Sequence, residues 1–594
     1  MGLVIIYMIS FLFSFDYSPS LGASLNYTSV FFKWPQISNK QSYKIYINSA
    51  SNDERIYSSD SNAIIIRGLN WDKDYFWRVC GLDENDSEVE CYENLYFSIK
   101  SIPANFPDIN ILFNSENLNY LNGITILDFE SIGISAGLDI SGNAIWFVTP
   151  DSFPTNKIII TQVLDNGNFL GFANGVGYEF DIDGQIVFQT PQSIGVHHQI
   201  HKAGETYFVL DQDRRQCPDN CPSDLPDVDY WKGDNFVELD FDGNVVWELS
   251  TFDFLGSNEY NPFWIDFIIN QGYDWTHSNS IFFESGVVYV SMRNLSRISA
   301  IDYDTKEVIW HIGDLDFMDS IFFNDGFGFS HQHSAQIIDN GNILFFDNGR
   351  NNNPEVSRCL EISFNESDAE IAWEHVLPSE MLTLSRGECD RLNNGNTLIS
   401  AGASGTVLEV DSNNDFVWKL LAKSNDNPTR IYRSQRIPGL FSNAFSYEVD
   451  NMIKEDGSYY FSKDSLILNS YNLGYLNQKY CYRFYNSNDA LVLDGDFEVG
   501  ADSNTSLALD FIDFYLGDYR LDVYPLNNIS KKQSLNFKKV DAGDVNLDEL
   551  VNVSDIILIV TLILGNQYTY LADMDENRSV NVSDIVLVVN KILQ

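Results

Sequence analysis

The chain of 594 residues has few basic side chains, 36 lysines and arginines against 84 aspartates and glutamates, so its formal charge is −48. Binding to nucleic acid or to an anionic membrane requires clustered basic residues, and neither is expected as a partner. An anionic substrate would need a local cationic pocket working against this charge. The length calls for several domains, and an aromatic content of 14% suits a β-rich globular protein.

The sequence has no apolar run long enough to cross a membrane. The run GLVIIYMISFLFSF in residues 2–15 is too short for a bilayer, and it fits the hydrophobic region of a signal peptide, although no Lys or Arg precedes it. We therefore expect residues 1–23 to be a signal peptide. The mature protein is then expected to be secreted or held at the cell surface, or to reside in a periplasm.

Cysteine is scarce as well, with seven in the chain. Two pairs are spaced for disulfides in an oxidising compartment: Cys80 with Cys91, and Cys217 with Cys221. The odd number leaves the pairing incomplete. Zinc at the C-x3-C spacing of the second pair is disfavoured, because no second pair of ligands follows it.

The middle of the chain contains a repeat. Six segments between residues 139 and 418 join an Asp-containing turn to an aromatic: DISGNAIW, DIDGQIVF, DFDGNVVW, DYDTKEVIW, NESDAEIAW and DSNNDFVW. Second hairpin signatures, such as LDNGNFLGFA and IDNGNILFFD, lie between them. Two hairpins make a four-stranded blade, so residues 104–445 are predicted to form a six-bladed β-propeller, with RIYRSQRI at 430–437 closing the ring.

Short alternating strands flank the repeat on both sides. Residues 24–103, with YKIYI and YFWRVCGLDE, resemble a fibronectin type III sandwich. Residues 446–538 are predicted to form a second small β domain to which no site can be assigned. The predicted fold class is therefore mainly β, with β-sandwich domains beside the propeller.

The last residues carry two 12-residue segments, DVNLDELVNVSD and DMDENRSVNVSD, each followed by an apolar helical run. In an EF-hand-type loop, oxygens at positions 1, 3, 5, 7, 9 and 12 wrap Ca²⁺, and an all-oxygen set suits a hard cation. The first loop offers Asp544, Asn546, Asp548, the carbonyl of Leu550, Asn552 and Asp555. The second offers Asp573, Asp575, Asn577, Ser579 through its carbonyl, Asn581 and Asp584. The alternative is that the segment is only an acidic tail exposed to solvent, with no bound metal.

These paired loops, in residues 539–594, resemble a small α-helical type I dockerin. The resemblance implies two Ca²⁺ ions and a protein partner, a cohesin-like module, or an anchoring role. Position 6, where the family usually has glycine, is Glu549 in one loop and Arg578 in the other. We expect a strained turn there.

All eight histidines lie between residues 197 and 375, and five fall just before the innermost hairpin of a predicted blade: His197, His198, His277, His331 and His333. The innermost strands of a propeller line its channel. The motifs VHHQI, DWTHSNSI and SHQHSAQI are therefore predicted to direct imidazoles into one funnel.

Residues 110–437 resemble the bacterial aryl-sulfate sulfotransferases, on VHHQIH, DWTHSNS, VSMRNLSRISAIDYDTKEVIWHIG and HQHSAQIIDNGNILFFDNG. That family moves a sulfuryl group from a phenolic sulfate donor to a phenol acceptor without a nucleotide or an active-site cofactor. The resemblance implies that His333 is the nucleophile and forms a transient sulfohistidine. It also implies roles for His277, Asn279, Arg293 and His198, with His197 as the rival of His198.

These residue types suit the chemistry independently of the resemblance. Sulfuryl transfer spreads negative charge over oxygens, so a site needs fixed donors such as the forked guanidinium of Arg293 and the amide of Asn279. A neutral imidazole can attack sulfur. His198 or His277 can exchange the phenolic proton.

Three other interpretations stay open. His331 and His333 with His198 or His277 could hold zinc or copper, but their motifs contain no carboxylate and Arg293 would be unexplained. Release of phenol without an acceptor would indicate a sulfatase. A non-catalytic propeller could act in surface adhesion or as a scaffold through its flanking modules. Arg297 is an alternative to Arg293 as the arginine of the site. Arg293 could also simply form an ion pair with an acidic neighbour.

Overall fold

The structure is a computed structural model that describes residues 17–49, 53–114, 120–149, 157–217, 228–268, 272–313, 327–365, 368–455, 457–511, 514–575, 577 and 579–594. The chain divides into two compact units, Ile102–Leu440 and a second made of the residues up to Ser101 together with Phe441–Gln594. Most of the predicted signal peptide lies outside the described residues. No helix in the described ranges is long and apolar enough to span a membrane.

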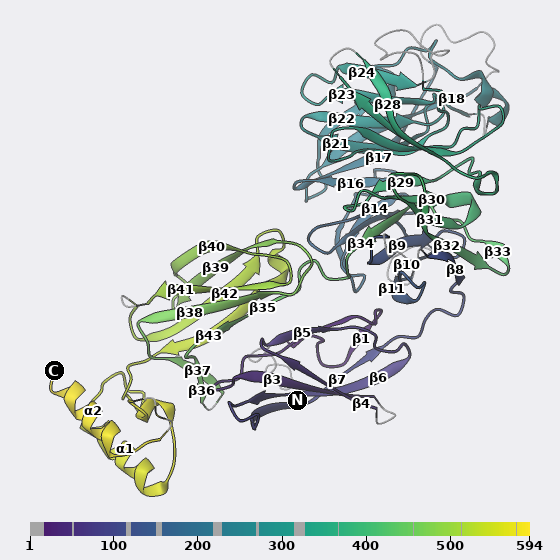
Figure 1. The fold of residues 1–594 in the computed structure, drawn as a ribbon. Coiled ribbons are helices and arrows are strands. Elements are labelled where there is room, and N and C mark those ends of the chain that lie inside the picture. Colours follow the sequence, from purple (N-terminus) through teal and green to yellow (C-terminus); the bar gives the residue numbers. More distant parts are fainter. Residues whose placement is uncertain are drawn as a thin grey trace, which may run out of the picture. The chain divides into compact units, whose positions relative to one another are not determined.

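Six sheets built on four-stranded antiparallel paths form the described part of Ile102–Leu440 (Figure 1). In chain order they are β9 (Ile124–Phe129), β10 (Ile134–Asp139) and β11 (Ala144–Val148) with β34 (Ser434–Ile437); β12 (Ile159–Val163), β13 (Phe169–Ala173), β14 (Val176–Phe180) and β15 (Ile186–Gln189); β16 (Ile200–Ala203), β17 (Thr206–Arg215), β18 (Tyr230–Leu239) and β19 (Val245–Ser250); β21 (Ser278–Glu284), β22 (Val287–Met292), β23 (Arg297–Asp302) and β24 (Val308–Gly313); β25 (His333–Ile337), β26 (Ile343–Asp347), β27 (Arg358–Phe364) and β28 (Ala369–Val376); and β29 (Glu388–Arg391), β30 (Thr397–Ala401), β31 (Thr406–Val410) and β32 (Phe416–Ser424). The strands β8 (Asp108–Asn114), β20 (Gly272–Asp274) and β33 (Asn427–Pro428) extend two of these sheets.

The six sheets follow one another round a circuit, which makes this unit propeller-like. The first strand of each sheet contacts the first strand of the next, from β9 through β12, β16, β21 and β25 to β29. The circuit returns through β34, which contacts β29 and pairs antiparallel with β9. The C-terminal end of the repeat region thus completes the first sheet, as the sequence predicted for RIYRSQRI.

The repeated turn has a local cause. In the first copy, Asp139 Oδ1 accepts the backbone N–H groups of Ser141 and Asn143 at 2.9 and 2.8 Å, and Gly142 adopts φ +84°. This side-chain turn sets the register of the last two strands of the sheet. The aromatic that follows then ties neighbouring sheets together, because Trp146 Nε1 donates to the carbonyl of Ile182 at 2.8 Å. Trp418 does the same from the sixth sheet to Ile140 in the first, at 2.9 Å.

In the other unit, the N-terminal β domain contains a five-stranded sheet in the order β1-β7-β6-β3-β4 and a two-stranded sheet of β2 and β5. Its strands are β1 (Ala23–Leu25), β2 (Val30–Lys33), β3 (Ser42–Ser49), β4 (Glu54–Ser59), β5 (Ala63–Ile66), β6 (Lys73–Leu82) and β7 (Glu88–Ile99). The fully buried Trp34 and Trp77 lie in its core.

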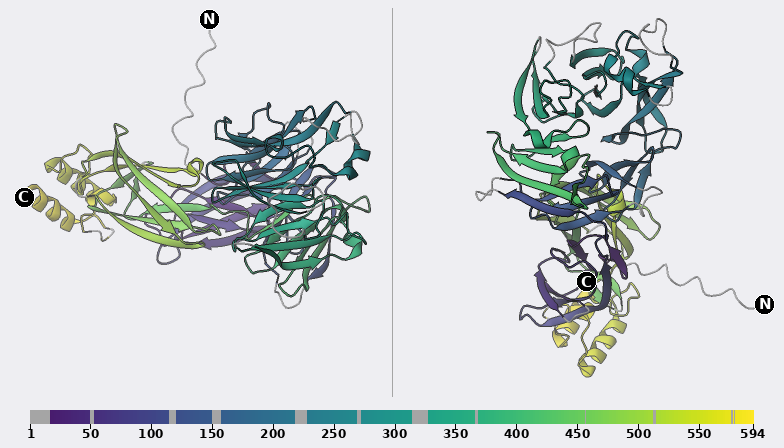
Figure 2. Two further views of the ribbon diagram at one scale, coloured as in Figure 1. Left: turned by 90° about the horizontal axis from the view of Figure 1, so that it is seen from above. Right: turned by 90° about the vertical axis from the view of Figure 1, so that its right-hand side faces the viewer.

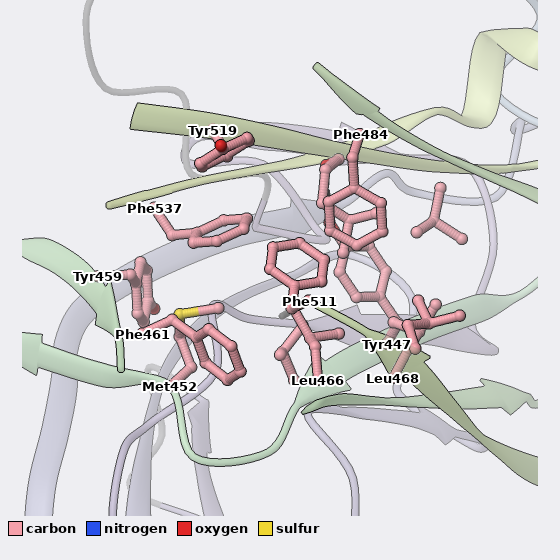
Figure 3. Packing of buried hydrophobic residues seen from close by; sticks show 14 of the residues in the cluster. Tyr447, Met452, Tyr459, Phe461, Leu466, Leu468, Phe484, Phe511, Tyr519 and Phe537 are labelled. Atoms are coloured by element: carbon pink, nitrogen blue, oxygen red, sulfur yellow. Dashed lines mark hydrogen bonds between the residues drawn. The ribbon is translucent and has the colours of Figure 1, made fainter. Parts of the chain in front are cut away.

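The second β domain of this unit has sheets in the orders β35-β38-β41 and β36-β37-β43-β42-β39-β40. Its strands are β35 (Phe445–Val449), β36 (Ile453–Glu455), β37 (Ser458–Phe461), β38 (Ser465–Asn472), β39 (Gln478–Asn486), β40 (Leu491–Val499), β41 (Ser503–Asp510), β42 (Gly517–Pro525) and β43 (Gln533–Lys539). Figure 3 shows the aromatic core between them, where Phe461, Phe511 and Phe537 gather.

The tail contains the helices α1 (Val553–Gly565) and α2 (Val582–Ile592), which lie side by side in yellow in Figure 2. The 3₁₀ helices of the described chain are η2 (Thr251–Asp253), η3 (Pro262–Phe267), η5 (Ser379–Met381), η6 (Gly402–Ser404), η7 (Ile529–Lys531) and η8 (Tyr570–Ala572). Asn552 and Asn581 cap α1 and α2 with their side chains. The helical runs expected after each loop are therefore present.

The cysteine pairing differs in part from the expectation. The Cys80–Cys91 disulfide joins β6 and β7 as the spacing suggested. A second disulfide, which the sequence did not suggest, links Cys359 of β27 to Cys389 of β29, in neighbouring sheets. Cys221, one half of the other predicted pair, lies outside the described residues.

Candidate active site

Four consecutive sheets present a residue in the same unusual conformation just before their first strand. His198, His277, His331 and Arg386 have φ of +61°, +49°, +58° and +70°. The left-handed region is unfavourable for side chains with a Cβ, and such strain persists where surrounding structure imposes it. The shared bend explains why the histidine motifs fall at one point of the repeat. It also places Arg386, which the sequence analysis missed, at the position equivalent to the histidines.

His333 begins β25 and is buried, with 4% of its surface exposed. Its Nδ1 lies 2.6 Å from Asn348 Oδ1 and 3.0 Å from the carbonyl oxygen of His331. Both partners are acceptors, so Nδ1 carries the proton and Nε2 keeps its lone pair. The backbone N–H of Arg386 donates to the lone pair of Nε2 at 3.3 Å. The histidine is therefore held in the tautomer that a nucleophile needs.

Asn348 is oriented by two further hydrogen bonds. Its Nδ2 donates to the carbonyl oxygens of Thr383 and Arg386 at 2.6 and 2.8 Å, which turns Oδ1 towards His333. Burial and the nearby charge of Arg293 hold the pKa of His333 well below its usual range. The imidazole is consequently neutral at ordinary pH.

His198 and His277 face one another with ring centroids 4.9 Å apart. His277 Nδ1 donates to Asp274 Oδ2 at 2.5 Å, which leaves Nε2 for the funnel. Asp274 also lies 3.3 Å from Lys232. His277 keeps 23% of its side chain exposed, so a substrate can reach it.

Arg293 is almost buried, and its guanidinium stacks over Trp264 at 4.5 Å. Its Nη1 donates to Asn294 Oδ1 at 3.1 Å, while Nε has no hydrogen-bond partner among the described residues. Burial lowers the pKa of Arg293 to about 10 even though Asp274 opposes the shift. A buried guanidinium with a free N–H suits an anionic ligand.

Asn279, the other predicted donor, is completely buried. Its Nδ2 donates to the carbonyl of Gln332 at 2.7 Å, and its Oδ1 has no hydrogen-bond partner in the described structure. One amide hydrogen is thus already engaged and supports the turn before His333.

Two other candidate residues, Arg297 and His331, make contacts that belong to the core rather than to the site. Arg297 is completely buried in an ion pair with Glu259 at 2.5 Å, which removes it as a rival of Arg293. His331 lies between Phe263 and Trp264, at ring-centroid distances of 5.6 and 5.2 Å. Neither ring nitrogen of His331 has a partner in the described part of the chain.

Sequence reasoning also missed several groups around this site. Arg386 forms a two-pronged ion pair with Glu130, at 2.5 and 3.1 Å. The ring of Tyr432 lies 6.2 Å from that of His198, and its buried hydroxyl has no partner in the described chain. The charge of Arg350, whose guanidinium stacks over Phe263, also acts on Arg293. Arg293 and Arg350 supply the local positive charge that an anionic substrate requires in so acidic a protein, whereas Glu130 balances the charge of Arg386.

Groups of side chains that could hold a metal ion lie outside the histidine site in the described ranges. Two clusters of at least three His, Cys, Asp or Glu side chains bring their ligand atoms within 4.8 Å in the described ranges. One is Cys80 with Glu88 and Cys91, and the other is Asp573 with Asp575 and Asp584.

The second of the two tail loops brings carboxylates together. Asp573, Asp575 and Asp584 bring three carboxylates together, the first and last of them buried. In the first loop, Asp555 accepts the N–H groups of Val545 and Asn552, which fixes its orientation. Buried carboxylates of one sign repel one another, so the all-oxygen set fits a hard divalent cation.

The remaining predicted ligands lie on the same loops. Asp544, Asn546, Asp548, Leu550 and Asn552 surround the first loop, with Leu550 O accepting from Asn552 Nδ2 at 3.2 Å. Asn577, Ser579 and Asn581 belong to the second, with Ser579 O accepting from Asn581 Nδ2 at 3.3 Å. Glu549, at the usual glycine position, has φ +68°, the strain that its identity suggested. Arg578 lies outside the described residues.

The propeller-like β fold presents a neutral, oriented histidine beside arginines, which suits a protein that handles an anionic group. Residues 86–414 match the model of the arylsulfotransferase (ASST) family, and the chain belongs to this family. Membership makes it a sulfotransferase in general terms and implies phenolic substrates.

None of the curated proteins matches the chain. Among solved structures, Kluyvelomyces marxianus Hsv2 is 6% identical over 61% of this chain and 95% of its own, with a TM-score of 0.26. Citrobacter koseri AztD is 8% identical over 79% of this chain and 98% of its own, with a TM-score of 0.25. Neither is close enough to bear on fold or function.

Proposed function

We propose that the protein transfers a sulfuryl group from a phenolic sulfate ester to a phenol, through a sulfohistidine on His333, within a six-bladed propeller. One observation carries the proposal: the Asn348 amide and the His331 carbonyl fix the proton of His333 on Nδ1 and leave Nε2 as a nucleophile. That lone pair accepts one hydrogen bond, from the backbone N–H of Arg386 at 3.3 Å, which an incoming sulfuryl group would displace. The nearby charge of Arg293 supplies attraction for the sulfate.

In the first half-reaction, His333 Nε2 attacks sulfur, and the N–S bond forms as the S–O bond to the donor phenol breaks. Arg293 stabilises charge on the sulfuryl oxygens, and removing one such donor typically costs about 3 kcal/mol. The departing phenolate takes the proton that His198 or His277 received from the acceptor in the previous turnover, and 4-nitrophenolate, a stable anion, can leave without it. Because the transferred group stays on the protein, the donor phenol leaves before the acceptor arrives.

In the second half-reaction, the acceptor phenol loses its proton to the same histidine. Its oxygen attacks sulfur, the N–S bond breaks, and His333 returns to its neutral tautomer. The exposed aromatic side chain of Phe263, at the rim beside Trp264, offers a flat apolar surface to a phenol ring.

We further propose that the protein is secreted or held at the cell surface. Its tail then acts as a dockerin that binds two Ca²⁺ ions and a cohesin-like partner, and residues 24–103 are a fibronectin type III-like module. The exposed apolar side chains of Ile557 and Leu564 on α1, and of Val586 on α2, support a partner surface there. With an inactive funnel, the same modules would make the protein an adhesion or scaffold component.

The direct test mixes the protein with 4-nitrophenyl sulfate, with and without a phenol acceptor. We expect a burst of nitrophenolate equal to the enzyme concentration, turnover only with acceptor, and an acid-labile sulfate on His333. His333→Ala should lose the burst and the label, whereas His375→Ala, at a histidine bonded to Asn414 away from this site, should keep both. Turnover without acceptor would indicate a sulfatase, and no burst with any aryl sulfate would leave the scaffold function.

A further inference from the structure

We propose that Asp234 and His197 form a proton relay that makes His198 the group exchanging the phenolic proton. The inference rests on the proposed function, and it assigns to His197 a positioning role rather than the rival role that the sequence left open. It also separates His198 from His277, which the sequence could not do.

Asp234 anchors the relay. It is 1% exposed, and its Oδ2 accepts from Thr276 Oγ1 and from the backbone N–H of Ser278, each at 2.6 Å. Its Oδ1 faces His197 Nε2 at 3.2 Å. Burial raises the pKa of Asp234, but His197 together with the hydrogen bonds from Thr276 and Ser278 outweighs it, so the pKa lies below its usual value. The carboxylate is therefore charged.

That charge fixes the proton on His197. A ring nitrogen facing a carboxylate oxygen carries its hydrogen, because two lone pairs would repel. The contact is an attraction between the carboxylate and the N–H dipole rather than a linear hydrogen bond, because the N–H of Nε2 is not aimed at the carboxylate oxygen. With its proton on Nε2, a neutral His197 offers a lone pair on Nδ1.

The next link is the 2.7 Å contact between His197 Nδ1 and His198 Nδ1. One of these two nitrogens must donate and the other accept. With His197 accepting, His198 carries its proton on Nδ1, and its Nε2 is a base. When that Nε2 takes a proton from a phenol, the Nδ1 proton crosses to His197, and the positive charge comes to rest beside Asp234.

The relay resolves an electrostatic difficulty. His198 is surrounded by His197, His277, His333 and Lys232, and burial together with these groups holds its pKa well below the usual range. A lone His198 would therefore be a poor base for a weakly acidic phenol. Through His197, His198 exchanges a proton without itself remaining charged. Protonated at Nε2, it is then ready to act as an acid.

The test separates the two half-reactions. His197→Gln and Asp234→Asn are compared with wild type, and with Asp213→Asn, which alters a carboxylate of the same sheet that accepts from Ser250 and lies outside this network. The nitrophenolate burst needs no proton, and we expect it to change less than about threefold in all variants. Transfer to a weakly acidic alkylphenol should fall about 100-fold in His197→Gln and Asp234→Asn, but much less for an acidic nitrophenol acceptor.

A second readout does not depend on activity. In ¹⁵N spectra of the wild type above neutral pH, we expect His198 to be protonated on Nδ1 and His197 on Nε2. The opposite tautomer at His198, or equal losses with acidic and weakly acidic acceptors, would overturn the relay while leaving the sulfohistidine intact. A wild type without a burst would overturn both proposals. Thermal melting of each variant distinguishes a lost relay from a lost fold.

Discussion

Replacing Asn348 by alanine should slow the formation of the sulfohistidine. The substitution removes the 2.6 Å acceptor of His333 Nδ1 and two donations to carbonyls, but it leaves the His331 carbonyl at 3.0 Å as a weaker acceptor. A buried polar group that loses its partner costs about 1–3 kcal/mol, or about 5- to 150-fold in rate. Because one acceptor remains, we expect the lower part of this range, about tenfold.

The assay is the stopped-flow burst of nitrophenolate at saturating 4-nitrophenyl sulfate, which reports the first half-reaction alone. Asn342→Ala is the matched control, because that amide donates to Glu361 in the hairpin of the same sheet, away from the histidine. A burst rate within twofold of wild type in Asn348→Ala would refute the argument that the tautomer of His333 matters.

Asn348→Asp gives the same argument a pH signature. A carboxylate at this position favours the imidazolium and raises the pKa of His333. Since the nucleophile must be neutral, the burst rate of this variant should fall as pH drops through the raised pKa. The wild type should stay flat across neutral pH, because burial keeps the pKa of its His333 low.

Three other perturbations have clear expected outcomes. Replacing both Cys359 and Cys389 by serine opens a link across 30 residues, and it should lower the free energy of unfolding by about 2–4 kcal/mol in urea titrations. Adding a calcium chelator should reduce the helical circular dichroism of the tail, with recovery on adding Ca²⁺, and Asp584→Asn should need more Ca²⁺ for the same recovery. Burial raises the pKa of Glu388 to about 8, above its value in the unfolded chain. The protonated group therefore contributes stability that is lost as pH rises through that pKa. Glu388→Gln should flatten this part of the profile of unfolding free energy against pH.

Local sequence patterns predict much of the fold and of the candidate site. The Asp-containing turns predict hairpins because one side chain, such as Asp139, satisfies two backbone donors. The histidine motifs predict a common site because they occupy one place in the repeat. The same rule applied to arginine identifies Arg386, whose segment RGECDRL occupies the position that HQHSAQI holds in the preceding sheet.

Other features depend on contacts that no short pattern encodes. Asn348 follows β26 and reaches His333 only because the backbone turns back between Ser330 and Gly349, joined by a 3.1 Å hydrogen bond. Asp234 lies in the middle of a strand, where an acid would ordinarily be placed on the solvent side. The Cys359–Cys389 disulfide joins neighbouring sheets, so its partners could not be read from spacing.

The four left-handed residues at the heads of the inner strands also bear on how such a protein changes over time. Glycine would relieve the backbone at any of these positions, so mutational drift that improves folding alone would erase the chemistry, and only selection for turnover keeps histidine or arginine there. Conversely, the bend is common to all four sheets and independent of the side chain. A new specificity can therefore arise by exchanging the side chains at these four positions, without a change in the sheets that carry them.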